Sequence, residues 1–577
     1  MLAKINKLTN WQAALIIAIL GFAVYFTGLH NPFQGDDISQ IVNNPVVHSL
    51  SHILLLFKGG TFFYNGNIAP LSGVWFRPLM MVVFSVIYAI FGLHAFYYHL
   101  IQLLLCIGSS YLLYLIFKRF FGSILALVLA LIFLVHPINS QVVLAIPSMQ
   151  DALFFFFGIL AFWLLIRFKS LKIMLLIAFC LFLSLLSKES GILFVAVCLL
   201  YLLIFKRKRF YPFLYITIIP VTLWMALKVH AVGLAINPHA GPIDSLSLGG
   251  RLLTMPSIML FYLSKLVFPL RLASIYHWVH PTFSLRYVLV PLIIDSGVIS
   301  LMACAGWLLY QKKRKEWFHI FLFFAIWAAI GLMMHLQFTP LDMTVCETWF
   351  YFSMVGVLGM IGVLLVAFQE KINPYWFTVI ALIVIALFGV RTALRGTDWS
   401  SPYKLASQDI IASPDDYIAY NTLASYYYDE HDLSDALLNI QKSINIYPNG
   451  NNYNIQGAIY TAEGNFALAK QAYDNGLKFQ TLSGLYDNLA AITPVYGNTE
   501  QNIQFLQSVV HKHPNDANLW FYLAVEEFIG GDKADSFISI KQAYSLVPTN
   551  QAIQTDYFDI NHNEMPIITF NPKPVPE

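Results

Sequence analysis

The stretch DALFFFFGILAFWLLIR, residues 151–167, begins with an acidic residue and ends with a basic one, with no charge between them. Similar apolar segments recur from residue 11 to residue 391, and a helix needs roughly 20 such residues to cross a bilayer. The chain of 577 residues is 58% hydrophobic and 11% charged. A soluble globular protein carries about 25% charged residues. The pattern therefore predicts a multi-pass, all-helical membrane protein.

Basic residues set the expected topology. If every apolar segment crosses and the N-terminus lies inside, the clusters at 118–119, 167–172 and 206–209 fall outside, against the positive-inside rule. The rule is restored when segments 74–92 and 253–270 lie along the outer interface as juxtamembrane helices. This arrangement predicts about 11 spans, with the basic clusters in the cytoplasm. Everything beyond residue 392 then lies on the outer side.

Composition also excludes several kinds of site. The net charge of +3 comes with Lys and Arg in short clusters between apolar runs, so no nucleic-acid partner is implied. The five cysteines are scattered and form no CxxC pair or disulfide framework. The chain has neither zinc-ligand spacing nor a Gly-rich nucleotide loop.

The chain turns polar after residue 395, and a repeat of about 33–34 residues follows. Pro448, Thr481, Pro514 and Pro548 align as helix-terminating positions, and small residues keep the same register at Ala424, Gly457, Ala490 and Ala524. This spacing is typical of tetratricopeptide (TPR) helix pairs. We expect a transmembrane domain at 1–395, a linker at 396–416, a TPR α-solenoid at 417–552 and an irregular tail at 553–577.

Asp36 and Asp37 follow Gly35 just after the first apolar segment. Two adjacent carboxylates repel each other, so one of them is expected to have a raised pKa, bind a metal ion or pair with a distant cation. Such a carboxylate can accept a proton from an acceptor hydroxyl. The alternative is a solvated helix N-cap.

Other ionisable residues lie at the ends of apolar segments, where charge is costly and is a functional candidate by default. Lys188, Arg77 and His136 are candidates to bind a phosphate, although each also has a structural alternative: a hairpin ion pair, interfacial snorkelling or a helix-end hydrogen bond. Glu189, Asp151 and Glu347 are candidates for substrate binding or for structural roles.

Several motifs occur in the order expected of one family: FQGDDISQIVNNPVV (33–47), HPINSQVVLAIPSMQDALFFFFGILAF (136–162), LLSKESGILF (185–194), YLSKLVFPLRLASIYH (262–277) and ETWFYFSMVG (347–356). With the C-terminal repeats, they resemble the transmembrane and TPR O-mannosyltransferases and their bacterial relatives, which are GT-C-fold glycosyltransferases. The resemblance implies transfer of a sugar from a polyprenyl-phosphate carrier to a hydroxyl acceptor, usually on a protein, outside the cytoplasm.

The resemblance also implies roles for individual residues. Asp36 and Asp37 match the acidic pair of the family's catalytic centre, and Lys188 with Glu189 matches its Lys-Glu element. No cofactor is certain, and a divalent metal at the two aspartates stays open. The resemblance fits a bacterial inner membrane with periplasmic repeats, or the endoplasmic reticulum with lumenal repeats in a eukaryote.

Three positions depart from the family pattern: Gln141 replaces a Glu, Gln150 a basic residue and Thr348 an Arg. These departures favour the alternative function, a non-catalytic membrane-anchored TPR scaffold for envelope proteins.

Overall fold

The computed structural model describes residues 8–63, 71–234, 241–311, 314–479, 483–493, 498–548, 551–564 and 566. Within these ranges the chain forms helices and two isolated β-bridges, with no strand. The all-helical prediction is therefore confirmed. The chain divides into two compact units, one of residues 1–62 and 71–414, the other of residues 63–70 and 415–577.

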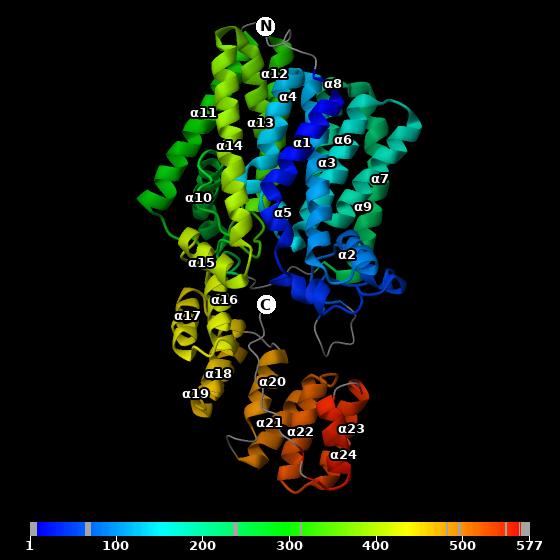
Figure 1. The fold of residues 1–577 in the computed structure, drawn as a ribbon, viewed down its shortest axis with the longest axis vertical. Coiled ribbons are helices and arrows are strands. Elements are labelled where there is room, and N and C mark those ends of the chain that lie inside the picture. The colour runs from blue at the N-terminus through cyan, green and yellow to red at the C-terminus, as the bar shows by residue number, and fades with distance from the viewer. Residues whose placement is uncertain are drawn as a thin grey trace. The chain divides into compact units, whose positions relative to one another are not determined.

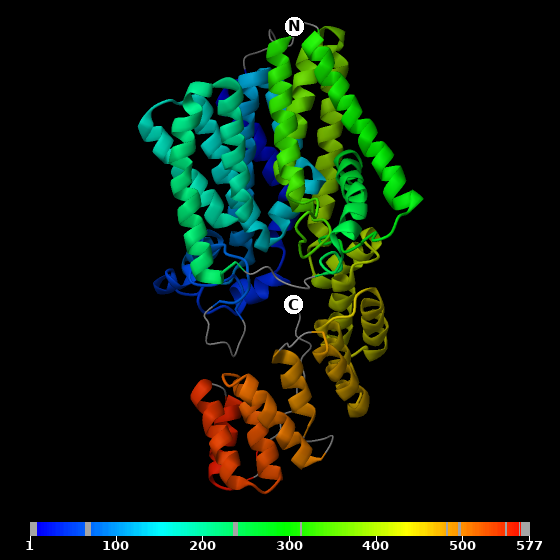
Figure 2. The ribbon, with the colours of Figure 1, turned by 180° about the vertical axis from the view of Figure 1, so that it is seen from behind.

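The first unit is a bundle of helices of unequal length (Figures 1 and 2). Its helices are α1 (Asn10–Tyr25), α2 (Pro78–Phe91), α3 (Ala95–Phe121), α4 (Ser123–Val135), α5 (Gln141–Leu144), α6 (Met149–Arg167), α7 (Leu171–Ser187), α8 (Ile192–Phe205), α9 (Phe210–Val232), α10 (Leu248–Val267), α11 (Val290–Gln311), α12 (Lys315–Met333), α13 (Phe350–Ala367), α14 (Pro374–Asp398) and α15 (Pro402–Ala412).

Among the described residues, seven helices are long and apolar enough to cross a membrane. The pair Ser123–Val135 and Pro137–Leu144, bent by 54°, makes an eighth if it is one span. The helices Asn10–Tyr25, Lys172–Ser187 and Glu189–Phe205 are apolar but shorter. The chain is thus a multi-pass membrane protein, and about 11 spans stays a prediction. Neither α2 nor α10, the two helices expected at the interface, is among the seven.

Glycines on α13 allow its close contact with neighbouring helices. A Cβ atom at Gly356 would lie 2.5 Å from the backbone of Phe324 and Ala328 on α12, and one at Gly362 would lie 2.5 Å from the Phe121 ring of α3. In a bilayer, helix association depends on such close packing, because lipid tails are as apolar as the side chains. The α12–α13 contact therefore requires glycine at position 356.

We expect Gly356→Ala to destabilise the bundle by about 1–3 kcal/mol, the usual cost of overpacking, because backbone atoms of α12 would have to move. Thermal unfolding in detergent measures the effect. Gly297→Ala on α11 is the matched control, because a Cβ there meets nothing within 4 Å. Equal melting temperatures for the two variants would contradict this account.

The segment after α1 is hydrogen-bonded to the last turns of α14. Thr27 donates to the Ala393 carbonyl at 3.2 Å, Asn31 to that of Gly396 at 3.1 Å, and Gln34 to that of Trp399 at 2.9 Å. These bonds hold the segment after α1 against the last turns of α14. The turns α3–α4, α6–α7 and α8–α9, which contain the basic clusters, lie at the opposite end of the bundle, where α1 begins (Figure 1).

The second unit contains α16 (Tyr417–Asp429), α17 (Leu433–Ile446), α18 (Gly450–Ala462), α19 (Phe466–Leu477), α20 (Ser483–Ile492), α21 (Thr499–Lys512), α22 (Ala517–Ile529), α23 (Lys533–Leu546) and α24 (Gln551–Asn561). Consecutive helices pack as pairs, for example α16 on α17 and α22 on α23. The small residues at 424, 457, 490 and 524 are all buried, each on the first helix of a pair.

The boundaries differ from those expected in two places. The expected linker, 396–416, contains the end of α14 and all of α15, which belongs to the first unit because Asp409 on α15 binds Arg395 and Ser274 there. The expected tail, 553–577, begins within α24, whose Ile553 and Ile560 are buried against α22 and α23. The remainder, apart from 562–564 and 566, lies outside the described residues.

Candidate functional site

The acidic pair lies in a tight turn after α1. Gly35 has a φ of +58°, in the left-handed region that glycine adopts without strain. The Asp37 Oδ2 accepts a hydrogen bond from the Gln34 backbone N–H at 3.0 Å, so this carboxylate closes the turn behind it. It makes no cap bond to the helical turn Ile38–Val42 that follows. The simple N-cap alternative therefore does not describe Asp37.

The two carboxylates occupy different surroundings. Asp37 is 2% exposed, and its Oδ1 has no hydrogen-bond partner among the described residues. Burial raises the pKa of Asp37 well above its usual value, the Gln34 N–H opposes this rise, and the charge of Asp36 adds to it. Asp36 is solvent-exposed. Desolvation by the surrounding protein raises its pKa to about 6, against the opposing charge of Arg77 and with a further rise from Asp342.

Arg77, at the start of α2, lies between two acidic groups. Its Nε is 4.0 Å from the Glu189 carboxylate and has no hydrogen-bond partner among the described residues, while its charge acts on Asp36. Its guanidinium lies 4.7 Å from the Trp75 ring centre, which fixes its plane. Glu189 also pairs with Lys228 of α9 at 3.4 Å. Arg77 therefore faces Glu189 at the limit of ion-pair distance, and its charge also acts on Asp36.

Lys188 and its neighbour Glu189 form ion pairs with different residues. Its Nζ lies 2.7 Å from Asp151 Oδ1, and both residues are buried, at 9% and 2% exposed. They line a small cavity together with His335 and Thr348. The His335 Nδ1 donates to the Gly331 carbonyl at 3.0 Å, and its ring stacks on Trp349. Asp151 therefore neutralises Lys188 in this conformation.

His136 and Gln141 hold segments of the bundle together. The His136 Nδ1 accepts from the Ile138 backbone N–H at 3.2 Å, so its Nε2 carries the hydrogen and donates to the Leu266 carbonyl at 3.0 Å. Both ring nitrogens are thus occupied. Gln141 Nε2 donates to the Ser274 carbonyl at 3.1 Å. A Gln amide can make this bond, which the family's carboxylate could not donate.

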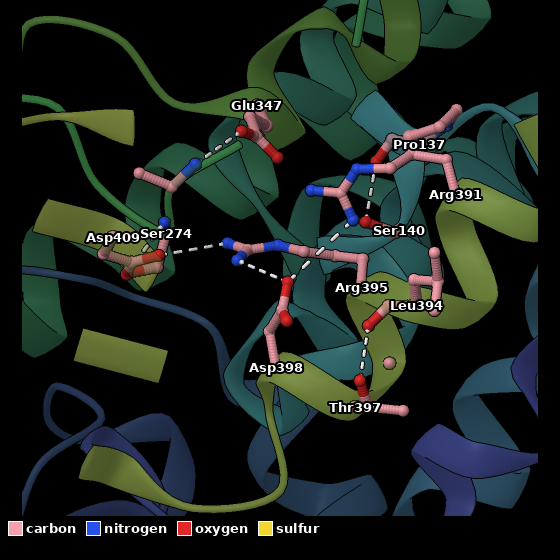
Figure 3. Close-up of polar contacts among 12 residues, drawn as sticks. Pro137, Ser140, Ser274, Glu347, Arg391, Leu394, Arg395, Thr397, Asp398 and Asp409 are labelled. Carbon is pink, nitrogen blue, oxygen red and sulfur yellow. Dashed lines mark hydrogen bonds and ion pairs between the residues drawn. The ribbon is translucent and has the colours of Figure 1, made fainter. Parts of the chain in front are cut away.

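A second charged cluster surrounds Arg395, which is 1% exposed (Figure 3). Its guanidinium lies 3.4 Å from Asp398 and 3.2 Å from Asp409, and Asp409 in turn accepts from the Ser274 N–H and hydroxyl. Arg391 lies 3.9 Å from Asp398. These contacts join α14, α15 and the segment after α10.

Glu347 belongs to this second cluster and not to the aspartate turn. Its Oε1 accepts from the Tyr276 hydroxyl at 2.7 Å and from the Ala273 N–H at 3.1 Å. Its buried Oε2 has no partner among the described residues. Thr348, where the family has Arg, lies 3.2 Å from the Cys346 sulfur and lines the Lys188 cavity.

The aspartate pair does not fit a protein-built metal site. In the part of the chain that the structure describes, no three His, Cys, Asp or Glu side chains gather where they could hold a metal ion. A divalent ion there would take most of its ligands from elsewhere.

Apart from His136, whose hydrogen bonds go to backbone groups, the predicted site residues thus separate into three groups. Arg77 and Glu189 lie with Asp36 and Asp37, Lys188 pairs with Asp151, and Glu347 joins the Arg395 cluster. The sequence analysis missed Arg391, Arg395 and Asp409. Two arginines inside an apolar segment are a signal that could have found the first two.

Comparisons with known proteins cover part of this site. Residues 77–230 match the family model of dolichyl-phosphate-mannose-protein mannosyltransferases. The chain is 31% identical over 204 residues to the human protein O-mannosyl-transferase TMTC1 and 27% identical over 196 residues to human TMTC3. A protein O-mannosyl-transferase of Caenorhabditis elegans is 26% identical over 194 residues.

These matches confirm the resemblance to the transmembrane and TPR O-mannosyltransferases.

The alignment with human TMTC1 covers 33% of this chain and 23% of the relative, and that with TMTC3 covers 33% and 21%. The chain thus matches about a quarter of the length of these O-mannosyltransferases. The family model covers α2 to α9 almost completely and therefore includes Arg77, His136, Asp151, Lys188 and Glu189.

We expect Arg395→Gln to destabilise this O-mannosyltransferase relative by about 3–5 kcal/mol, because it leaves the Asp409 carboxylate buried without its cation. Lys470→Gln, which breaks an ion pair whose side chains are 46% and 44% exposed, should change little. Unfolding in detergent, followed by intrinsic fluorescence, measures both variants. The double variant Arg395→Met with Asp409→Leu should recover most of the loss. A melting temperature of Arg395→Gln like that of the wild type would contradict the role of this pair.

Proposed function

We propose that this chain is a membrane glycosyltransferase that moves a sugar, mannose by analogy with its relatives, from a polyprenyl-phosphate carrier to a hydroxyl acceptor, most simply on a protein. The observation that carries the proposal is the turn after α1: Asp37 is buried and closes the turn through the Gln34 N–H, while its neighbour Asp36 stays accessible, with the charge of Arg77 acting on it. The resemblance to O-mannosyltransferases over 77–230 supports it.

In this mechanism Asp36 acts as the general base. Its carboxylate accepts the proton of the acceptor hydroxyl while the acceptor oxygen attacks the anomeric carbon. The bond from that carbon to the phosphate oxygen breaks, its electron pair stays on the phosphate, and the configuration at the carbon inverts. Arg77 stabilises the charge that develops on the phosphate. Buried Asp37 holds the turn and keeps Asp36 in place.

The other candidates enter the mechanism less directly. Lys188 would reach a phosphate only if it left Asp151, and His136 only if it gave up one of its two backbone bonds. We therefore assign the Lys188–Asp151 pair and His136 to positioning the helices around the site. Glu189 positions Arg77 and Lys228. A metal step is not part of the proposal.

The proposed topology is a GT-C-type bundle of about 11 spans with the basic turns in the cytoplasm. The ends of α1 and α14, and with them Asp36, then face outward, to the periplasm of a bacterium or the lumen of the endoplasmic reticulum in a eukaryote. The second unit follows α15, and its successive helix pairs and in-register small residues support a TPR solenoid. Such a solenoid would hold the acceptor protein and raise its concentration at the site.

Asp36→Asn should reduce transfer at least about a hundredfold, the usual contribution of a general base, whereas Asp37→Asn should reduce it far less because an Asn oxygen can still accept the Gln34 N–H. The measurement is incorporation of labelled mannose from polyprenyl-phosphate mannose into protein, in membranes from cells that express each variant. Thermal unfolding of each purified variant controls for folding. Full activity of Asp36→Asn, or of the double variant, would disprove the catalytic role.

The rate of transfer should fall as the pH drops below about 6, because Asp36 accepts a proton only when ionised and its pKa is raised to about 6. Arg77 lowers this pKa, so Arg77→Gln should move the acidic limb of kcat/KM to higher pH, while Arg77→Lys should move it less. A profile of kcat/KM against pH for the three proteins tests this. An acidic limb that does not move in Arg77→Gln would show that Asp36 is not the titrating base.

A non-catalytic scaffold is the competing function, favoured by the Gln at 141 and 150 and the Thr at 348. The two functions differ in one simple observation. The proposed enzyme should retain a polyprenyl-phosphate lipid during purification and lose it in the Arg77→Gln variant, whereas a scaffold should show no such loss.

A further inference from the structure

A cluster of cations lies on the far side of α14 from the aspartate turn. Gly389 and Gly396 face the end of α1, where added Cβ atoms would meet Val24 and Thr27. Arg391 lies about 200° around the helix from Gly389, at 3.6 residues per turn. Its Nε donates to the Leu270 carbonyl at 2.9 Å. The next carbonyl, that of Arg271, accepts from Lys265 Nζ. The charged groups of Lys265 and Arg391 thus donate to the carbonyls of two consecutive residues.

Positive charge is in excess at this point. Asp398 and Asp409 both form ion pairs with Arg395, and Arg391 lies 3.9 Å from Asp398. Within the described ranges, no carboxylate lies at ion-pair distance from Lys265 or from exposed Arg271. The Glu347 carboxylate is held by Tyr276 and Ala273. Desolvation lowers the pKa of Lys265, and the charge of Glu347 opposes this change. The positive charges of Arg271, Arg391 and Arg395 lower the pKa further.

Apolar side chains are exposed on both sides of these cations. Phe268 and Leu270, in the turn after α10, are 71% and 70% exposed, and Leu387, Val390 and Leu394 of α14 are 64%, 61% and 56% exposed. On a membrane protein such surfaces contact lipid tails. Cations at the end of a span, next to lipid-facing side chains, lie at the depth of the headgroups.

We propose that Lys265, Arg271 and Arg391 bind the phosphate of an anionic membrane lipid whose tails run along the exposed apolar face of α14. Lys265 and Arg391, which bond the carbonyls of adjacent residues, supply charge-assisted hydrogen bonds to phosphate oxygens. Exposed Arg271 supplies a third cation. Because none of these three residues belongs to the aspartate turn or contacts Arg77, the inference does not rest on the proposed transfer reaction. The phosphate is that of a glycerophospholipid, because exposed apolar side chains flank the cations on both sides, as two acyl tails require. Polyprenyl phosphate is the carrier that the proposed function already assigns to Asp36 and Arg77.

Native mass spectrometry of the full chain in detergent tests the proposal. Phosphatidylglycerol, polyprenyl phosphate or inorganic phosphate is added in separate titrations, with phosphatidylcholine as the zwitterionic reference. We expect phosphatidylglycerol to bind in preference to phosphatidylcholine. Lys265→Gln and Arg391→Gln should each weaken that binding about tenfold, the loss expected for one hydrogen bond to a charged group.

Arg286→Gln is the matched control, because Arg286 is an exposed arginine just before α11, stacked on Tyr287, with no carboxylate partner among the described residues. It should leave lipid binding unchanged. Lys265→Arg and Arg271→Lys keep the charge and should retain binding, which separates loss of the site from loss of the fold. Loss of polyprenyl phosphate, and not of phosphatidylglycerol, in the Gln variants would make these cations part of the carrier site of the transfer reaction and would overturn the proposal.

Three further outcomes would overturn the proposal: equal binding of both anionic lipids and phosphatidylcholine, equal binding by the Gln variants and the wild type, and binding of inorganic phosphate alone.

Discussion

A charge inside an apolar bundle has to be paired or hydrogen-bonded, because neither lipid nor packed side chains can solvate it. This constraint organises the first unit. Lys188, at the end of α7, is buried with Asp151 at the start of α6, and Arg395 with Asp409 and Asp398, so two charged clusters join α6 to α7 and α14 to α15. Asp409 also binds Ser274, which is distant in the sequence. The pairs hold the polar end of the bundle together. The segment that leads into Asp36 and Asp37 is bonded to the same end of the bundle, through Asn31 to Gly396 and Gln34 to Trp399.

The same constraint separates charged side chains that only stabilise the fold from those that can bind a ligand or take part in catalysis. A buried cation whose carboxylate lies at hydrogen-bond distance has little left to offer a ligand, as Lys188 shows. Arg77 differs because its acidic neighbours are more distant and its Nε has no partner among the described residues. Its electrostatic link to exposed Asp36 makes that turn the best candidate for sugar transfer, and Lys265 and Arg271, which have no carboxylate at ion-pair distance among the described residues, are the cations of the proposed lipid site.

Much of the fold could be predicted from the sequence. Long apolar segments separated by basic clusters identified a multi-pass helical membrane protein, and the 33–34-residue spacing of prolines and small residues located the helix pairs of the second unit. The linker was less predictable. Residues 402–412 are polar enough to suggest a loop, but Asp409 forms a long-range contact with Arg395 that local composition does not reveal.

What the sequence by itself determined was which residues could carry chemistry, since an ionisable residue beside an apolar segment is rare and costly wherever it occurs. Which of them act together was decided by the tertiary structure alone. Asp36 and Asp37 are neighbours in the chain, yet one is exposed and the other buried; Lys188 and Glu189 are neighbours too, yet they pair with Asp151 and with Arg77 and Lys228. The physical reason is that pairing depends on distances of a few ångströms between helices, and helix packing sets those distances.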